Sequence, residues 1–153
     1  MSLLDEVLTS NPAAAPRRST PPGDYTMVVK SHRFGKNPKN ENENVEFTFG
    51  LLDATGGQEL EGVDLSRAQA YYTLWITAGT RDSGIVERVL KEMGIWQEGA
   101  TIRDMVEAGV GASFDGTVEL RKKDIESGQK YPRLDVTRIG EFINRPNNSR
   151  VKD

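Results

Sequence analysis

Five stretches of this chain alternate apolar with polar residues, and one stretch with helical spacing separates the first three from the last two. The clearest alternation runs from Val45 to Leu51 and predicts a strand with one buried face. The same pattern predicts strands from Asp24 toward Phe34 and over residues 69–76, 114–120 and 131–139. Such half-buried strands must bring their apolar faces together around a common core.

Apolar spacing changes from two to three and four between residues 81 and 96, which predicts a helix. Asp82 or Ser83 is the candidate N-cap and Gly94 the candidate C-cap, and a shorter helix is predicted from Ile102 to Ala108. Three strands, a main helix and two more strands is the order of a five-stranded OB-fold barrel, a mainly β fold with one or two helices. An open sheet packed under one helix is the alternative.

The chain has 153 residues, a length that suits one domain. We expect a flexible N-terminal segment with a Pro/Ala linker over residues 1–22, the OB-fold domain over residues 23–140, and a mobile tail over residues 141–153. No apolar run approaches the length of a membrane span, and the first ten residues are acidic rather than basic, so we expect a cytoplasmic protein, in the host cytoplasm if viral.

Basic residues gather in two turn-forming segments of an otherwise acidic chain. Residues 31–44 contain three bases and two acids, and residues 121–133 contain five bases and two acids. Residues 53–115, in contrast, carry 5 bases against 11 acids. In the expected barrel these basic segments join strands one to two and four to five, the loops with which OB folds bind oligonucleotides. Cationic loops suit a phosphate backbone, although such lysines can also serve only to keep a hairpin tip in water.

Aromatic residues accompany both basic segments and the third strand. In that strand Leu74 and Ile76 continue the inward pattern, so Tyr71 and Trp75 are expected to point outward, where bases can stack on them. The same two rings can instead cover a subunit interface. The candidate nucleic-acid-binding residues are His32, Arg33, Phe34, Lys36, Lys39, Tyr71, Trp75, Arg121, Lys122, Lys123, Lys130, Tyr131 and Arg133.

Catalytic signatures are weak. The single histidine, His32, cannot form a multi-histidine metal site, and the chain has no cysteine for a thiolate site or a disulfide. The carboxylates between Asp53 and Asp64 lack the spacing of a known cation-binding loop, and Gly109-Val110-Gly111 lacks the lysine of a P-loop. We therefore predict no enzyme, no metal and no cofactor.

Several ordered features resemble small bacteriophage single-stranded DNA-binding proteins of OB type, a family often catalogued as a domain of unknown function. They are Pro22-Gly23-Asp24-Tyr25, the stretch FTFGLLDATGGQELEG, the LWI that ends the third strand, and Gly128-Gln129-Lys130-Tyr131 before the last strand. The resemblance implies binding of single-stranded DNA in phage DNA replication or recombination, with replication or recombination proteins as partners. One departure is the tail from Gly140 to Asp153, which carries three bases and two acids instead of a run of acids.

The leading hypothesis is a sequence-tolerant single-stranded DNA-binding protein, with a second copy of the chain as a further candidate partner and no membrane. The alternative is an OB-like protein-interaction or virion-assembly module in which Tyr71, Trp75 and Trp96 form a subunit contact. A metal-assisted nuclease that uses the carboxylates between Asp53 and Asp64 ranks behind both.

Overall fold

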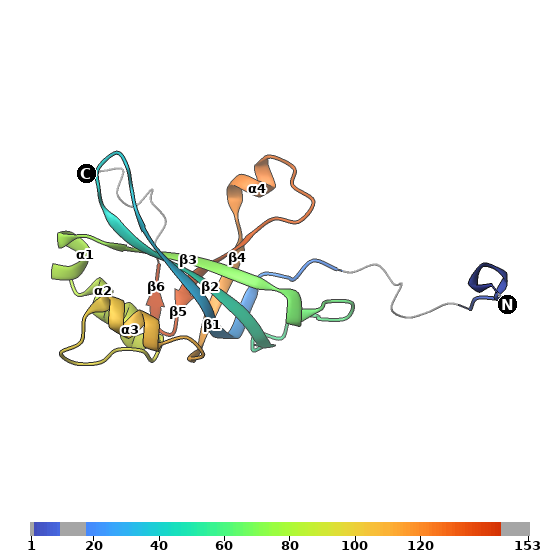
Figure 1. Cartoon of the computed structure of the whole chain (residues 1–153), viewed down its shortest axis with the longest axis horizontal. Helices are drawn as coiled ribbons and strands as arrows, with labels where there is room; N and C mark the ends of the chain where they lie inside the picture. Colours follow the sequence, from blue (N-terminus) through green and yellow to red (C-terminus); the bar gives the residue numbers. More distant parts are fainter. Residues whose placement is uncertain (1, 10–17, 145–153) are drawn as a thin grey trace.

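Strand pairing closes a β-barrel in the computed structural model, which describes residues 2–9 and 18–144 (Figure 1). The sheet has the order β3-β2-β1-β4-β5-β6, and an additional β3–β5 pairing closes it. The strands are β1 (Gly23–Lys36), β2 (Glu43–Ala54), β3 (Gln69–Ile76), β4 (Ser113–Leu120), β5 (Leu134–Ile139) and β6 (Phe142–Ile143). The predicted five-stranded, OB-like barrel is confirmed, and the open-sheet alternative is wrong.

Parallel pairing between β3 and β5 is short, whereas every other neighbouring pair of strands is antiparallel. Ala70 pairs with Leu134, and Tyr71 pairs with Asp135. These two positions bring the third and fifth strands together, which makes the barrel continuous. The short β6 pairs with β5 beyond this point, Arg138 with Ile143 and Ile139 with Phe142.

The barrel interior is filled by the residues that alternate inward from each strand. Tyr25, Met27, Phe47 and Phe49 are at most 1% exposed, and Phe49 packs edge-on against Phe114 with ring centroids 4.9 Å apart. On β3 the predicted inward residues Ala70, Tyr72 and Leu74 are buried, and Ile76 is half-buried. This packing explains why β3 turns its other side chains outward.

Both predicted helices are present, the one from Ile102 to Ala108 with the predicted bounds, and two further short helices are additional to the prediction. The helices are α1 (Ala78–Asp82), α2 (Ile85–Glu92), α3 (Ile102–Ala108) and α4 (Lys122–Glu126), together with the 3-10 turns η1 (Leu3–Asp5) and η3 (Leu65–Arg67). None of the helices in the described part of the chain is long and apolar enough to cross a membrane.

Gly84 separates α2, which corresponds to the predicted main helix, from α1, which lies before the predicted helix start. Its φ of 82° is left-handed, which interrupts the helix between α1 and α2. The predicted caps Asp82 and Ser83 are wrong, because Thr77 caps α1 through a capping box and Gly84 itself precedes α2. Gly94 does follow α2 in a left-handed conformation, with φ 78°, as a helix end requires.

The first basic segment is mostly strand rather than loop. Ser31 to Lys36 pair with Thr48 to Glu43, so only residues 37–42 form the turn. Asn37 closes that turn: its amide donates to the Asn42 carbonyl over 2.8 Å, and its side-chain oxygen accepts from the Lys39 amide over 2.8 Å. The prediction of a long loop was wrong because a polar, asparagine-rich sequence can still pair as a ladder when its partner strand continues.

The predicted end segments are described only in part. The N-terminal segment contains η1, and the predicted mobile tail begins with β6, which extends the sheet to Ile143. Residues 10–17 of the predicted linker and residues 145–153 of the predicted tail lie outside the described residues.

Gly116 on β4 occupies a position that has no room for a side chain. A Cβ there would lie 2.4 Å from the Arg138 carbonyl oxygen and 2.5 Å from Cε of Met27.

We expect Gly116→Ala to lower the free energy of unfolding by about 1–3 kcal/mol, because the barrel must shift to accept the added methyl group. Urea denaturation measures this change. The matched control is Gly79→Ala in α1, whose nearest neighbour is 3.7 Å away and which should leave stability unchanged or slightly raised. An equal effect of both changes would contradict the packing described.

Candidate nucleic-acid interface

Outward side chains of β1, β2 and β3 form one continuous surface, which we call the strand face. Its two rows follow the pairing of the strands. Tyr71, Thr48 and Ser31 form one row, and Thr73, Glu46 and Arg33 form the next. A hollow of about 300 Å³ lies over these residues, and Arg133 from the segment before β5 also lines it. The strand face is therefore bordered by the second basic segment.

Arg133 lies directly over Tyr71. The guanidinium carbon is 4.4 Å from the ring centroid, and Nε donates to Oδ1 of Asp135 over 2.8 Å. Because Asp135 pairs with Tyr71 across the closing strands, barrel closure itself fixes this contact. Two of the predicted site residues from distant parts of the sequence are thus brought together, and both offer a flat surface on which a base can stack.

Two further predicted aromatic residues are exposed on either side of this pair. Trp75, near the opposite end of β3, is 40% exposed, and Tyr131, two residues before Arg133, is 64% exposed. Nζ of Lys130 lies 5.5 Å from the Tyr131 ring centroid. The predicted outward orientation of Trp75 and Tyr71 is confirmed.

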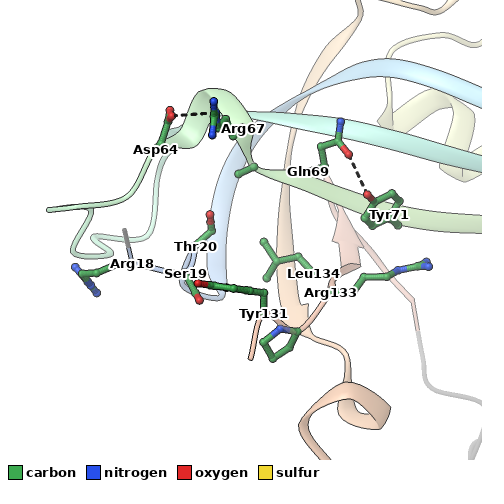
Figure 2. Close-up of a pocket in the computed structure, with 12 residues that line it drawn as sticks. Arg18, Ser19, Thr20, Asp64, Arg67, Gln69, Tyr71, Tyr131, Arg133 and Leu134 are labelled. Carbon is green, nitrogen blue, oxygen red and sulfur yellow. Dashed lines mark hydrogen bonds and ion pairs between the residues drawn. The ribbon is translucent and has the colours of Figure 1, made fainter. Parts of the chain in front are cut away.

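A larger hollow of about 810 Å³ adjoins the strand face and shares Tyr71 and Arg133 with it (Figure 2). Its other side is formed by residues 18–20, which precede β1, and by the turn that contains η3. Arg18 and Arg67 both line this hollow. Neither arginine is among the predicted site residues, because Arg18 lies in a segment interpreted as linker and Arg67 lies in a net acidic stretch.

No family model and no curated protein matches this chain. The function proposed below therefore depends on the geometry and chemistry of the strand face and of the larger hollow beside it.

The second basic segment is folded around a buried carboxylate, not extended as a plain loop. Oδ1 of Asp124 accepts from Nη2 of Arg121 over 2.8 Å, and Oδ2 accepts from the Arg133 amide over 2.8 Å. The side chain of Asp124 is only 5% exposed. First the Arg121 guanidinium and then the Arg133 amide hold the pKa of Asp124 below its usual value. Arg121 thus has a role in the fold, and its contact with nucleic acid stays a prediction.

The remaining lysines of the prediction are exposed. Lys122 and Lys123 lie on α4, Lys130 lies next to Tyr131, and Lys39 lies in the β1–β2 turn. In the view of Figure 1 this turn and α4 project from the upper side of the barrel, with α2 and α3 below. In that view both basic segments lie on the upper side, the β1–β2 turn to the left and α4 to the right (Figure 1). Lys36 is also exposed and pairs with Glu41, with Nζ 3.7 Å from Oε1.

His32 and Phe34 point toward the inner side of β1, and His32 also lines the hollow over the strand face. A register shift between Val29 and Ser31 inserts one residue into β1, so the alternation changes by one. Arg33 then points outward beside Glu46, while Phe34 is half-buried against the core beneath the guanidinium of Arg103, at 4.3 Å.

His32 follows the same inward direction as Phe34. It pairs with the buried Phe47, and its ring meets Phe34 edge-on at 5.1 Å. Its buried Nδ1 has no hydrogen-bond partner among the described residues. No pattern in the sequence marks this bulge, so both residues are among the predicted site residues.

The carboxylates considered for metal binding have local structural roles. Oε1 of Glu59 accepts from the Glu61 amide over 3.1 Å, and Oδ1 of Asp64 accepts from the Ser66 amide over 3.1 Å. Within residues 2–9 and 18–144, no group of three histidine, aspartate or glutamate side chains is placed to hold a metal ion.

The ion pair of Asp124 leads to a pH-dependent prediction. We expect Asp124→Asn to lower the melting temperature by a few degrees at neutral pH, because the amide cannot replace the charge-assisted bonds to Arg121 and Arg133. The pKa of Asp124 is lower in the folded than in the unfolded protein. The stability that Asp124 contributes is therefore fully present above the ordinary aspartate pKa of about 3.9, and it is lost as the pH falls through the lowered pKa of the folded state. Melting curves of both proteins across acid pH measure this. A difference that is constant down to the lowest pH would contradict it.

Proposed function

We propose that the strand face binds single-stranded DNA without strong sequence preference. The observation that carries this proposal is the Tyr71–Arg133 pair, which lies on the strand face together with the exposed, outward ring of Trp75. Every base has a flat face, so aromatic rings and guanidinium planes bind bases of any identity. A duplex keeps its bases paired and stacked, and therefore cannot offer those faces to the barrel.

Electrostatics supports the same ligand. Lys39, Lys122, Lys123 and Lys130 are exposed and form no ion pair within the described residues, so they can contact phosphates at little cost. Arg33 and Arg133, in contrast, already contact carboxylates. We assign the lysines of the two basic segments to the phosphate backbone and the ring-bearing surface between them to the bases.

The biological setting is proposed from the family resemblance. The resemblance implies a phage-type protein that covers exposed DNA strands during replication or recombination in the host cytoplasm. Replication or recombination proteins are its proposed partners, and it performs no catalytic step of its own. The choice of DNA as the ligand has the same basis.

Stacking on Tyr71 gives a direct test. We expect Tyr71→Ala to weaken binding of a fluorescent dT oligomer by about 5- to 150-fold, the loss that corresponds to about 1–3 kcal/mol of base stacking. Fluorescence anisotropy at low salt measures the affinity. The matched control is Tyr71→Phe, which keeps the ring and removes only the hydroxyl that donates to Gln69 over 2.9 Å. This control should bind like the native protein, and Trp75→Ala should weaken binding in the same direction as Tyr71→Ala.

Absence of binding by the native protein at low salt would refute the proposed function. Light scattering then separates the alternative. A stable oligomer that ignores the oligonucleotide would favour a protein-interaction module, although Trp96 lines a hollow beside α3 and not the strand face.

The lysines predict the salt dependence. A triple change of Lys122, Lys123 and Lys130 to Gln should reduce the slope of log K against log salt by about 2, because each phosphate contact on a single strand contributes about 0.7. The control changes Arg81, Arg88 and Lys91 to Gln, which removes equal charge from α1 and α2. Titrations at several salt concentrations measure both slopes. Equal slopes for the two triple variants would show that the second basic segment does not contact phosphates.

A further inference from the structure

We propose that the larger hollow beside the strand face is a second nucleotide subsite, which extends the path of the bound strand past Tyr131 toward residues 18–20. This inference rests on the proposed function and adds a place where the strand continues. The two hollows share Tyr71 and Arg133, so a strand that leaves the strand face beside this pair enters the larger hollow directly.

The shape of the larger hollow suits a nucleotide. Its volume of about 810 Å³ exceeds that of the hollow over the strand face, about 300 Å³. Figure 2 shows Leu134 between Gln69 and Tyr131, with Arg18 and Arg67 farther out. Leu134 is buried and gives the hollow an apolar floor, and the ring of Tyr131 is 64% exposed. An apolar floor with one open ring accepts a base, as small-molecule sites in general combine apolar walls with a few polar groups.

Arg18 is the candidate phosphate ligand. Its Nη1 donates to the Glu61 carbonyl over 2.8 Å and to the Glu59 carbonyl over 3.3 Å. Within the described part of the chain its Nε and Nη2 have no acceptor, and one edge of the guanidinium is thus held while the other is available. A guanidinium fixed in this way presents two parallel donors to a phosphate. Its own amide donates to the Gly62 carbonyl over 2.9 Å, which anchors the backbone here.

Arg67 adds a second cation on the other side of the hollow. Its Nε lies 3.8 Å from Oδ2 of Asp64, a loose contact between exposed side chains. An exposed ion pair of this kind contributes little to stability, so exchange of the carboxylate for a phosphate costs little. Ser19, Thr20 and Gln69 supply hydroxyl and amide groups around the same hollow. Two arginines and one ring match a phosphodiester with its base better than they match an uncharged ligand.

Oligonucleotide length tests this inference. A strand that occupies only the strand face cannot reach Arg18 and Arg67, so only longer strands gain from them. We expect the double variant Arg18→Ala/Arg67→Ala to bind the shortest dT oligomers, about 4 nucleotides, like the native protein. It should lose about tenfold in affinity for oligomers of about 12–16 nucleotides, because charge-assisted contacts to phosphate are absent. Anisotropy titrations of a length series measure this.

Three controls make the result specific. Tyr71→Ala should lose affinity at every length, whereas Tyr131→Ala should follow the arginine variant and lose affinity only with the longer strands. Arg88→Ala on α2 should match the native protein throughout. Thermal melting verifies that each variant is folded, and Arg18→Lys/Arg67→Lys should recover part of the salt dependence without the full affinity, since lysine lacks the paired donors.

The outcomes separate the two proposals. If the arginine variant binds every length like the native protein while Tyr71→Ala binds weakly, the second subsite is wrong and the strand face stands. If the arginine variant loses the same factor at every length, the hollow is not a separate subsite, and the inference is overturned. If the native protein binds no oligomer at any length, the proposed function itself fails.

Discussion

The short parallel contact between β3 and β5 is the constraint on which the rest of this structure depends. Only two residue pairs form it, yet it joins the two halves of the chain and closes the barrel. One of the pairs, Tyr71 with Asp135, also shapes the edge of the strand face. Asp135 holds the guanidinium of Arg133, and Arg133 lies on the Tyr71 ring. Barrel closure and the shape of the proposed binding surface therefore depend on the same few atoms. The buried carboxylate of Asp124 reinforces this arrangement by holding the amide of Arg133 in place.

The bulge in β1 has an equally local cause and a wide effect. One inserted residue between Val29 and Ser31 reverses the direction of every side chain that follows on the strand. Arg33 thereby points to the strand face, and Phe34 packs against the core under the guanidinium of Arg103. A hairpin that otherwise carries mixed basic and aromatic residues is thus sorted into a charged outer side and an aromatic inner side.

Most of the fold could be predicted from the sequence, since alternation such as that from Val45 to Leu51 reports directly which side chains are buried. The same information placed Tyr71 and Trp75 outward, because the inward positions of β3 were already filled by aliphatic residues and Tyr72. The bulge could not be predicted, because it depends on how β1 pairs with β2. α1 could not be predicted either, because its sequence AGTRD has no apolar period. Arg18 was missed for a related reason. Its importance comes from carbonyl groups on a turn far away in the sequence, which no local pattern reveals.

Barrel closure also determines when the strand face and the larger hollow can form during synthesis of the chain. Tyr71 leaves the ribosome well before Arg133 and Asp135, and contacts between such distant positions form late because a long loop must first be closed. Until then the aromatic residue has no guanidinium above it, and the hollow that it shares with residues 18–20 has no opposite wall. An incomplete chain therefore already contains aromatic and basic residues of this surface, but the contacts that bring them together have not yet formed. The Tyr71–Arg133 contact can therefore form only after β5, the last long strand of the barrel, has been made.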